Sequence, residues 1–252
     1  MVSLVRRELR AIAAAASLLT RLPVASRVRI DEDDVARSLA WLPLVGVGIG
    51  GLLSLAGRLI EGRLDVWPAA ALIVAFWALV TGAIHLDGLA DSADGLGGRD
   101  RAQRLAIMRD PHIGSYGAIA LVLLIVLKVG LVAGVLARGH HLWLLAIPAI
   151  ARAGSASLSV ALPYARDEGT GAALVRGGHR PERLAVALAT AIVAALACAR
   201  LRGVLALAAA ALVVLVVGRI AQRRIGGVTG DVLGAAIELA ECAALVGLLA
   251  GR

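Results

Sequence analysis

Long apolar runs separated by short polar segments dominate the chain. Seven runs come close to the length of about 20 mostly apolar residues that a helix needs to cross a bilayer. They cover residues 41–60, 67–86, 114–137, 142–162, 184–199, 203–218 and 232–250. Because lipid offers the backbone no hydrogen-bond partners, each run is expected to be helical. The pattern predicts an all-α, polytopic integral membrane helical bundle with about seven transmembrane helices.

Two features of the pattern refine this prediction. Only Arg200 and Arg202 interrupt the apolar stretch between the fifth and sixth runs, which favours a tight helical hairpin there. Residues 9–24 are weakly apolar and predict an interfacial or re-entrant helix. The chain has no convincing internal repeat or low-complexity linker, so residues 1–252 are interpreted as a single membrane domain.

Composition supports a membrane protein. Apolar residues make up 60% of the chain, whereas soluble domains contain about 45–50%. Aromatic residues account for only 3%, so small apolar residues dominate, which suits close helix packing in lipid. Cys198 and Cys242 lie in apolar runs, and their spacing indicates neither a metal site nor a disulfide framework.

The distribution of positive charge predicts the orientation. With seven spans, the N-terminal segment and residues 87–113, 163–183 and 219–231 fall on one side and carry 18 Lys and Arg residues, against 6 on the other side. The positive-inside rule places the richer side in the cytoplasm. This retention also accounts for most of the net charge of +8, so no nucleic acid partner is expected. A bacterial inner membrane is the expected location.

The densest acidic cluster is the run HLDGLADSADG at residues 85–95. Asp87, Asp91 and Asp94 are spaced i, i+4 and i+7, which puts their carboxylates on one face of a helix. Like charges on one face repel each other, whereas Mg²⁺ would bridge such carboxylates and substrate phosphates. A magnesium site is favoured over the alternative, a solvated acidic helix end.

A basic and glycine-containing segment follows the acids. It carries Arg99, Arg101, Arg104 and Arg109, then Gly114-Ser115-Tyr116-Gly117 at the start of the third predicted span. Arginine matches phosphate geometry, and amides at a helix N-terminus favour an anion. The order of carboxylates, arginines and a glycine-bearing helix start favours phosphate binding over simple cytoplasmic retention.

Two further polar segments fall on the same predicted side. The first is the turn from Tyr164 to Gly171, which contains Arg166. The second runs from Gly226 to Asp231 and leads into the last span. Either Thr229 or Asp231 is a natural N-cap there, and a role for Asp231 in the site is an equal alternative.

Ionisable residues also occur inside the predicted spans, where they are costly. Glu238 and Glu241 are three residues apart in the last run, and Lys128 and Arg152 lie in earlier runs. One interpretation pairs these cations with the glutamates. The alternative is a buried polar path to the site.

The motifs together resemble a known family. The run HLDGLADSADG, then RLAIMRDPHIGSYG and GGVTGDVLGAAIELAE, with LTRLP near the N-terminus, is similar to the cobalamin synthase family of adenosylcobinamide-GDP ribazoletransferases. The similarity extends over about residues 17–241. Arg109 stands where the family usually has lysine, and Pro111-His112 where it usually has small or polar residues.

The resemblance implies a Mg²⁺-dependent membrane enzyme of late cobalamin synthesis. Such an enzyme joins adenosylcobinamide-GDP, a corrinoid, to α-ribazole or its 5′-phosphate and releases GMP. Because the sequence offers no credible nucleophile, the reaction is expected to be a direct attack without a phospho-enzyme. The lipid bilayer is the expected partner, and the oligomeric state, a homo-oligomer included, stays open. The predicted catalytic residues are Asp87, Asp91, Asp94 and His85, the three aspartates being the metal ligands, and the predicted diphosphate-binding residues are Arg104, Arg109, Gly114, Ser115, Tyr116, Arg166 and Asp231.

Two other classes are weighed against this one. CDP-alcohol phosphotransferases use a similar Asp-Gly-x-x-Ala pattern. In that family an arginine follows the alanine, whereas here Asp91 follows Ala90. A secondary transporter would use Arg152, Glu238 and Glu241 as a midplane ion path. It would not need three clustered aspartates outside the membrane.

Overall fold

The computed structural model describes residues 2–21, 29–169, 171–177 and 180–250. Every regular element in these ranges is a helix, and the only β contact found there is an isolated bridge between Tyr164 and Val228. The elements are α1 Val2–Leu19, α2 Glu32–Ser38, η1 Leu39–Trp41, α3 Leu42–Ile60, α4 Val66–Thr81, α5 Ile84–Leu96, α6 Arg101–Ile107, α7 Ser115–Leu136, η2 His141–Leu145, α8 Ile147–Ala161, α9 Ala172–Gly177, α10 Pro181–Ala199, α11 Leu201–Ile225 and α12 Gly230–Leu249.

The predicted helical membrane bundle is confirmed. Six helical stretches in the described part of the chain are long and apolar enough to cross a membrane, and the bent pair α4–α5 adds a seventh if it forms one span. The stretches are Glu32–Ile60, Ser115–Leu136, His141–Ala161, Pro181–Ala199, Leu201–Ile225 and Gly230–Leu249. The tight α10–α11 hairpin is also present, and α11 continues to Ile225, beyond the predicted end at residue 218.

The second predicted span, 67–86, is wrong at its C-terminal end. Helix α4 stops at Thr81, and the chain turns by 90° before α5 begins. Gly82 and Ala83 both take left-handed backbone conformations, with φ of 64° and 56°. The Ala83 amide donates back to the Ala78 carbonyl at 2.8 Å, which is the usual way to close a helix end at a left-handed glycine. His85 and Asp87 therefore lie in the first turns of a new helix.

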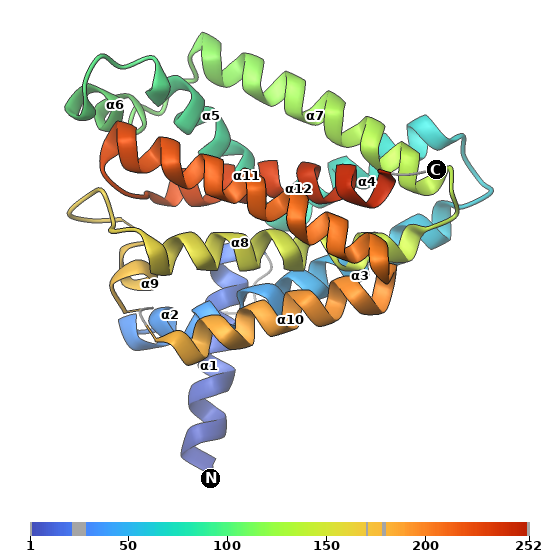
Figure 1. Cartoon of the computed structure of the whole chain (residues 1–252), viewed down its shortest axis with the longest axis horizontal. Coiled ribbons are helices and arrows are strands. Elements are labelled where there is room, and N and C mark those ends of the chain that lie inside the picture. The colour runs from blue at the N-terminus through green and yellow to red at the C-terminus, as the bar shows by residue number, and fades with distance from the viewer. Residues whose placement is uncertain (1, 22–28, 170, 178–179, 251–252) are drawn as a thin grey trace.

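The long helices run in similar directions, and the polar segments gather at one end of them (Figure 1). Helix α6, helix α9 and the loop between α11 and α12 lie at this end, at the left of Figure 1. The α3–α4 and α7–η2 connections lie at the opposite end. Helix α12 is in contact with α5, α7, α8 and α11, so it links the polar end to the core.

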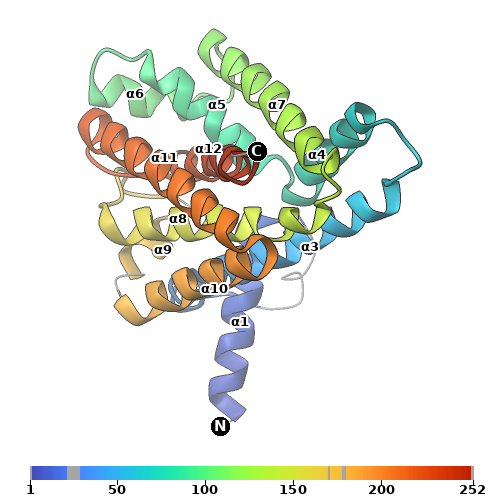
Figure 2. The same ribbon diagram turned by 45° about the vertical axis from the view of Figure 1, so that its right-hand side comes forward.

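Helix α1 runs across the direction of the long helices, and its N-terminus projects away from them in both views (Figures 1 and 2). The second half of α1 packs into the bundle, where Ala11, Ala14, Ala15 and Leu19 are buried. Val5 and Leu9 in its first half are exposed. The interfacial or re-entrant interpretation of residues 9–24, of which 22–24 lie outside the described ranges, stays a prediction.

Small residues let the helices approach closely, as expected in lipid. A Cβ atom at Gly46 of α3 would lie 2.7 Å from the backbone of Pro148 and Ala149 in α8. Only glycine permits that contact without moving a helix. The small-residue composition noted in the sequence is therefore used in packing.

The pairing interpretation of the buried charges is confirmed. Lys128 Nζ of α7 lies 2.8 Å from Glu238 and 2.5 Å from Glu241, and Arg152 Nη1 of α8 lies 2.5 Å from Glu241. All four residues are buried, and their formal charges cancel. The Lys128 ammonium also lies 4.0 Å from the centroid of the Trp77 ring, which adds a cation–π contact. These contacts tie α7 and α8 to α12.

Candidate active site

Backbone hydrogen bonds join the polar segments at one end of the bundle. The Ala165 amide donates to Val228 at 2.8 Å, and the Val228 amide donates to Pro163 at 2.9 Å. Arg101 of α6 then donates to the carbonyls of Ala165 and Ile225 at 2.7 and 2.8 Å. The expected convergence of the three segments on one side is therefore observed.

Helices α5 and α12 cross at two glycines, and this crossing builds the centre of the site. A Cβ atom at Gly88 would lie 2.8 Å from the Asp231 carbonyl oxygen, and one at Gly234 would lie 3.2 Å from the Cα of His85. The close approach brings Asp87 and Asp91 of α5 to Asp231 of α12. Asp91 lies within electrostatic range of both other carboxylates.

Arg166 supplies positive charge to these acids. Its Nη2 atom lies 2.7 Å from Asp231 and donates to the Met108 carbonyl at 3.3 Å. Its Nε is buried and has no hydrogen-bond partner among the described residues. The guanidinium thus retains a donor beyond its contacts with the protein.

The structure separates the two alternatives for Thr229 and Asp231. Thr229 is the N-cap of α12, and its hydroxyl accepts a hydrogen bond from the Val232 amide at 3.2 Å. Asp231 follows in the first helical turn and pairs with Arg166 instead. The capping role thus belongs to Thr229, and Asp231 faces the other acids.

Asp94 has a different environment from Asp87 and Asp91. Its carboxylate accepts the amides of Gly114 and Gly117 at 2.8 and 2.9 Å, where α7 begins. The predicted anion site at this helix start is therefore filled by a carboxylate of the chain itself, which the helix dipole favours. Across the described residues, no group of three or more His, Cys, Asp or Glu side chains is gathered closely enough to hold a metal ion.

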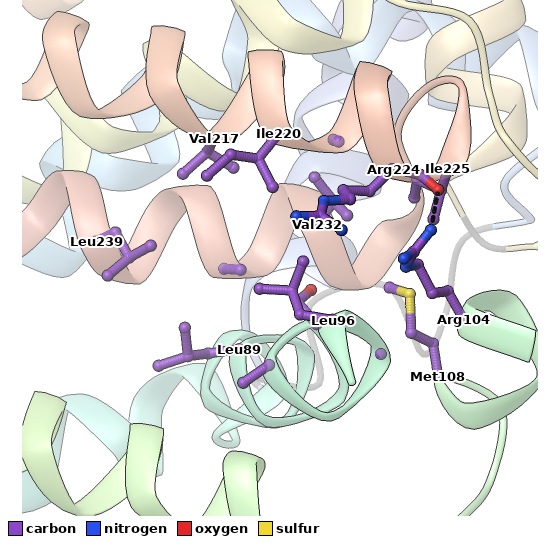
Figure 3. Close-up of a pocket in the computed structure, with 15 residues that line it drawn as sticks. Leu89, Leu96, Arg104, Met108, Val217, Ile220, Arg224, Ile225, Val232 and Leu239 are labelled. Carbon is purple, nitrogen blue, oxygen red and sulfur yellow. Dashed lines mark hydrogen bonds between the residues drawn. The ribbon is translucent and has the colours of Figure 1, made fainter. Parts of the chain in front are cut away.

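The other predicted phosphate-binding residues are spread around the acids. Arg109, Ser115 and Tyr116 are exposed at the same end of the bundle. Arg104 donates to the carbonyls of Arg99 and Arg224, both at 3.2 Å. Figure 3 shows Arg104 at the edge of an apolar cavity of about 160 Å³ between α5, α6, α11 and α12. The predicted set of arginines is not collected at one point.

Tyr164 is a site residue that sequence reasoning described only as part of a turn. Its ring is partly buried against Gly169 and Gly171. Burial raises the pKa of the Tyr164 hydroxyl above its ordinary value. The signal in the sequence was the pair of glycines that the ring needs beside it.

His85 lies beneath the acids. It is only 4% exposed, and its Nδ1 finds no hydrogen-bond partner in the described part of the chain. It lines a second cavity, of about 270 Å³, together with Asp87 and Asp231. The site thus combines three carboxylates, one arginine and an adjoining cavity.

Comparisons with known proteins agree on one family. The family described as cobalamin-5-phosphate synthase matches residues 11–249. The adenosylcobinamide-GDP ribazoletransferase of Stutzerimonas stutzeri is 41% identical over 236 residues, which cover 93% of this chain and 95% of the relative. The protein of the same name from Pseudomonas aeruginosa strain PAO1 is 39% identical over 252 residues, 96% of this chain and 99% of the relative. No solved structure matches the chain.

Proposed function

We propose that this chain is an adenosylcobinamide-GDP ribazoletransferase acting in cobalamin synthesis. It belongs to the cobalamin-5-phosphate synthase family. Relatives named adenosylcobinamide-GDP ribazoletransferase cover nearly the whole chain. The structural observation that supports this function best is the meeting of Asp87, Asp91 and Asp231 beside Arg166. A CDP-alcohol phosphotransferase or a transporter is not favoured by these relatives.

The reaction transfers the cobinamide phosphoryl group from the phosphate of GMP to an alcohol of the acceptor. The hydroxyl of α-ribazole or of its 5′-phosphate forms a bond to the phosphorus on the cobinamide side of the diphosphate. The bond from that phosphorus to the bridging oxygen breaks, and GMP leaves with the electron pair. Positioning and charge neutralisation dominate such reactions, so a single direct displacement is sufficient.

Magnesium fits the carboxylates that are free to bind it. Asp87 and Asp91 are one helical turn apart, and Mg²⁺ typically uses one or two carboxylates together with substrate phosphates. When bound, Mg²⁺ would neutralise charge on the diphosphate. Asp94, held by two amides, would instead fix the start of α7 against α5.

The side chains of the site then have distinct roles. Arg166 supplies the positive charge for a phosphate oxygen, and Asp231 orients its guanidinium at 2.7 Å. Asp87 lines the cavity beside the site, where its carboxylate oxygen that is not engaged by the metal would accept the proton of the attacking hydroxyl.

Removal of divalent metal is expected to abolish GMP release. Purified protein would be incubated with adenosylcobinamide-GDP and α-ribazole 5′-phosphate, with the corrinoid product identified by mass. Chelation should reduce the rate to background, because the diphosphate charge is then no longer neutralised, and added Mg²⁺ should restore it. Full activity in excess chelator would contradict a metal-dependent mechanism.

The enzyme is proposed to lie in the bacterial inner membrane with the site facing the cytoplasm. Support comes from the excess of Lys and Arg on the polar side. In a background with Cys198 and Cys242 changed to alanine, Glu168→Cys and Arg63→Cys would report opposite ends of the bundle. Both positions are exposed.

In intact cells, a membrane-impermeant maleimide that reaches the periplasm is expected to label Arg63→Cys only. Glu168→Cys should react only after the membrane is permeabilised. Labelling in the reverse order would invert the proposed orientation and leave the fold unchanged.

A further inference from the structure

Residues of six helices line the cavity beside Asp87. Its walls come from α1, α3, α5, α9 and α12, with one residue of α8, and its volume is about 270 Å³. Half of its lining residues are aliphatic, and they include Leu18, Leu42, Leu174, Leu233 and Ile237. A concave space that combines apolar walls with a few polar groups is typical of a small-molecule site.

Four polar residues line the cavity. Asp87 and Asp231 belong to the proposed phosphoryl-transfer site as well. The other two are His85 and Ser155. His85 is 4% exposed, and its Nδ1 lacks a hydrogen-bond partner within the described ranges. Because the imidazole ring lines the cavity, it is the group there that can donate a hydrogen bond to a neutral ligand.

The two substrates of the proposed reaction differ in how they match this space. The corrinoid of the donor is too large to fit in a cavity of about 270 Å³. The acceptor carries a flat benzimidazole base that is apolar except for one free ring nitrogen, which accepts a hydrogen bond. Its sugar carries the hydroxyl that must reach the carboxylates of the cavity.

We propose that this cavity binds the benzimidazole base of the acceptor. The His85 imidazole, which lines the cavity, donates to the free nitrogen of the base, and the aliphatic walls contact the rings of the base. The sugar then lies toward Asp87, which accepts the proton of its attacking hydroxyl. This inference rests on the proposed function and assigns the acceptor to one side of the site.

Two substitutions test this proposal, because each is expected to change the KM for the acceptor and not the KM for the donor. His85→Phe keeps an aromatic ring and removes the donor. Leu18→Trp narrows the cavity from α1, at a residue that is only partly buried. Each variant is expected to raise the KM for α-ribazole roughly tenfold, as for the loss of one good contact, with the KM for adenosylcobinamide-GDP changed less than about twofold.

The matched control is Ile220→Trp, which narrows the separate apolar cavity of Figure 3 and should leave both KM values unchanged. Size-exclusion elution would verify folding, and if one variant fails to fold, the other decides. An unchanged acceptor KM, or an equal rise in both KM values, would overturn the proposal. A wild-type protein without transferase activity would instead refute the proposed function.

Discussion

Asp91→Asn is expected to lower turnover by at least about 10²-fold, a loss near 2.7 kcal/mol of transition-state stabilisation. The side chain keeps its size and loses its charge, so the protein should still fold and insert. Asp91 lies within electrostatic range of Asp87, Asp231 and Arg166, at the centre of the site. Without its charge, the proposed metal ion loses one of its two carboxylate ligands. GMP release at saturating substrates and Mg²⁺ would measure the effect.

Asp94→Asn provides the contrast for this variant. Asp94 accepts two amides at the start of α7, so its change should lower the thermal unfolding temperature as well as turnover. Asp91→Asn should lower turnover and leave that temperature nearly unchanged. Activity close to wild type in Asp91→Asn would exclude this carboxylate from the site, whatever Asp94 does.

The spans could be predicted from the sequence because the chain is surrounded by lipid. In lipid, an apolar run must be helical, so hydropathy alone located most spans to within a few residues. The break at Gly82 and Ala83 escaped that reasoning because both residues are apolar or neutral and sit inside an apolar run. What ends α4 is a left-handed turn, against which the side chain of Arg21 packs. That contact spans about sixty residues of sequence and has no local signal.

The sequence indicated which residues belong to the candidate site, but it did not indicate which of them contact one another. The i, i+4, i+7 spacing correctly indicated a helix for the aspartates. It did not reveal that Asp94 would turn to the α7 amides, because Gly114 and Gly117 lie about twenty residues further along. The glycines at the α5–α12 crossing were visible in the sequence, but their meaning depends on which helix they meet. Asp231 joins the acids only through that crossing.

The buried charges beneath the site connect it to the stability of the bundle. Glu241 is the shared partner of Lys128 and Arg152, at 2.5 Å from each. It is fully buried and lies on α12, the helix that begins at the site with Asp231. A loss of charge balance here is therefore expected to disturb both the core and the position of the N-terminal end of α12.

Glu241→Ala is expected to destabilise the folded protein by about 3–5 kcal/mol, the range for removing one partner of a buried ion pair. Two cations then share Glu238 alone, and the four-residue cluster carries an uncompensated positive charge. Thermal unfolding in detergent and the yield of folded protein would both report the loss. The double variant Glu241→Leu with Arg152→Leu is the matched control, since it leaves Lys128 paired with Glu238 at 2.8 Å and no net charge. It should recover much of the stability, because apolar residues often replace buried ion pairs without loss. If Glu241→Ala were as stable as the wild type, or if the double variant were less stable than Glu241→Ala, charge balance would not be what holds α7 and α8 to α12.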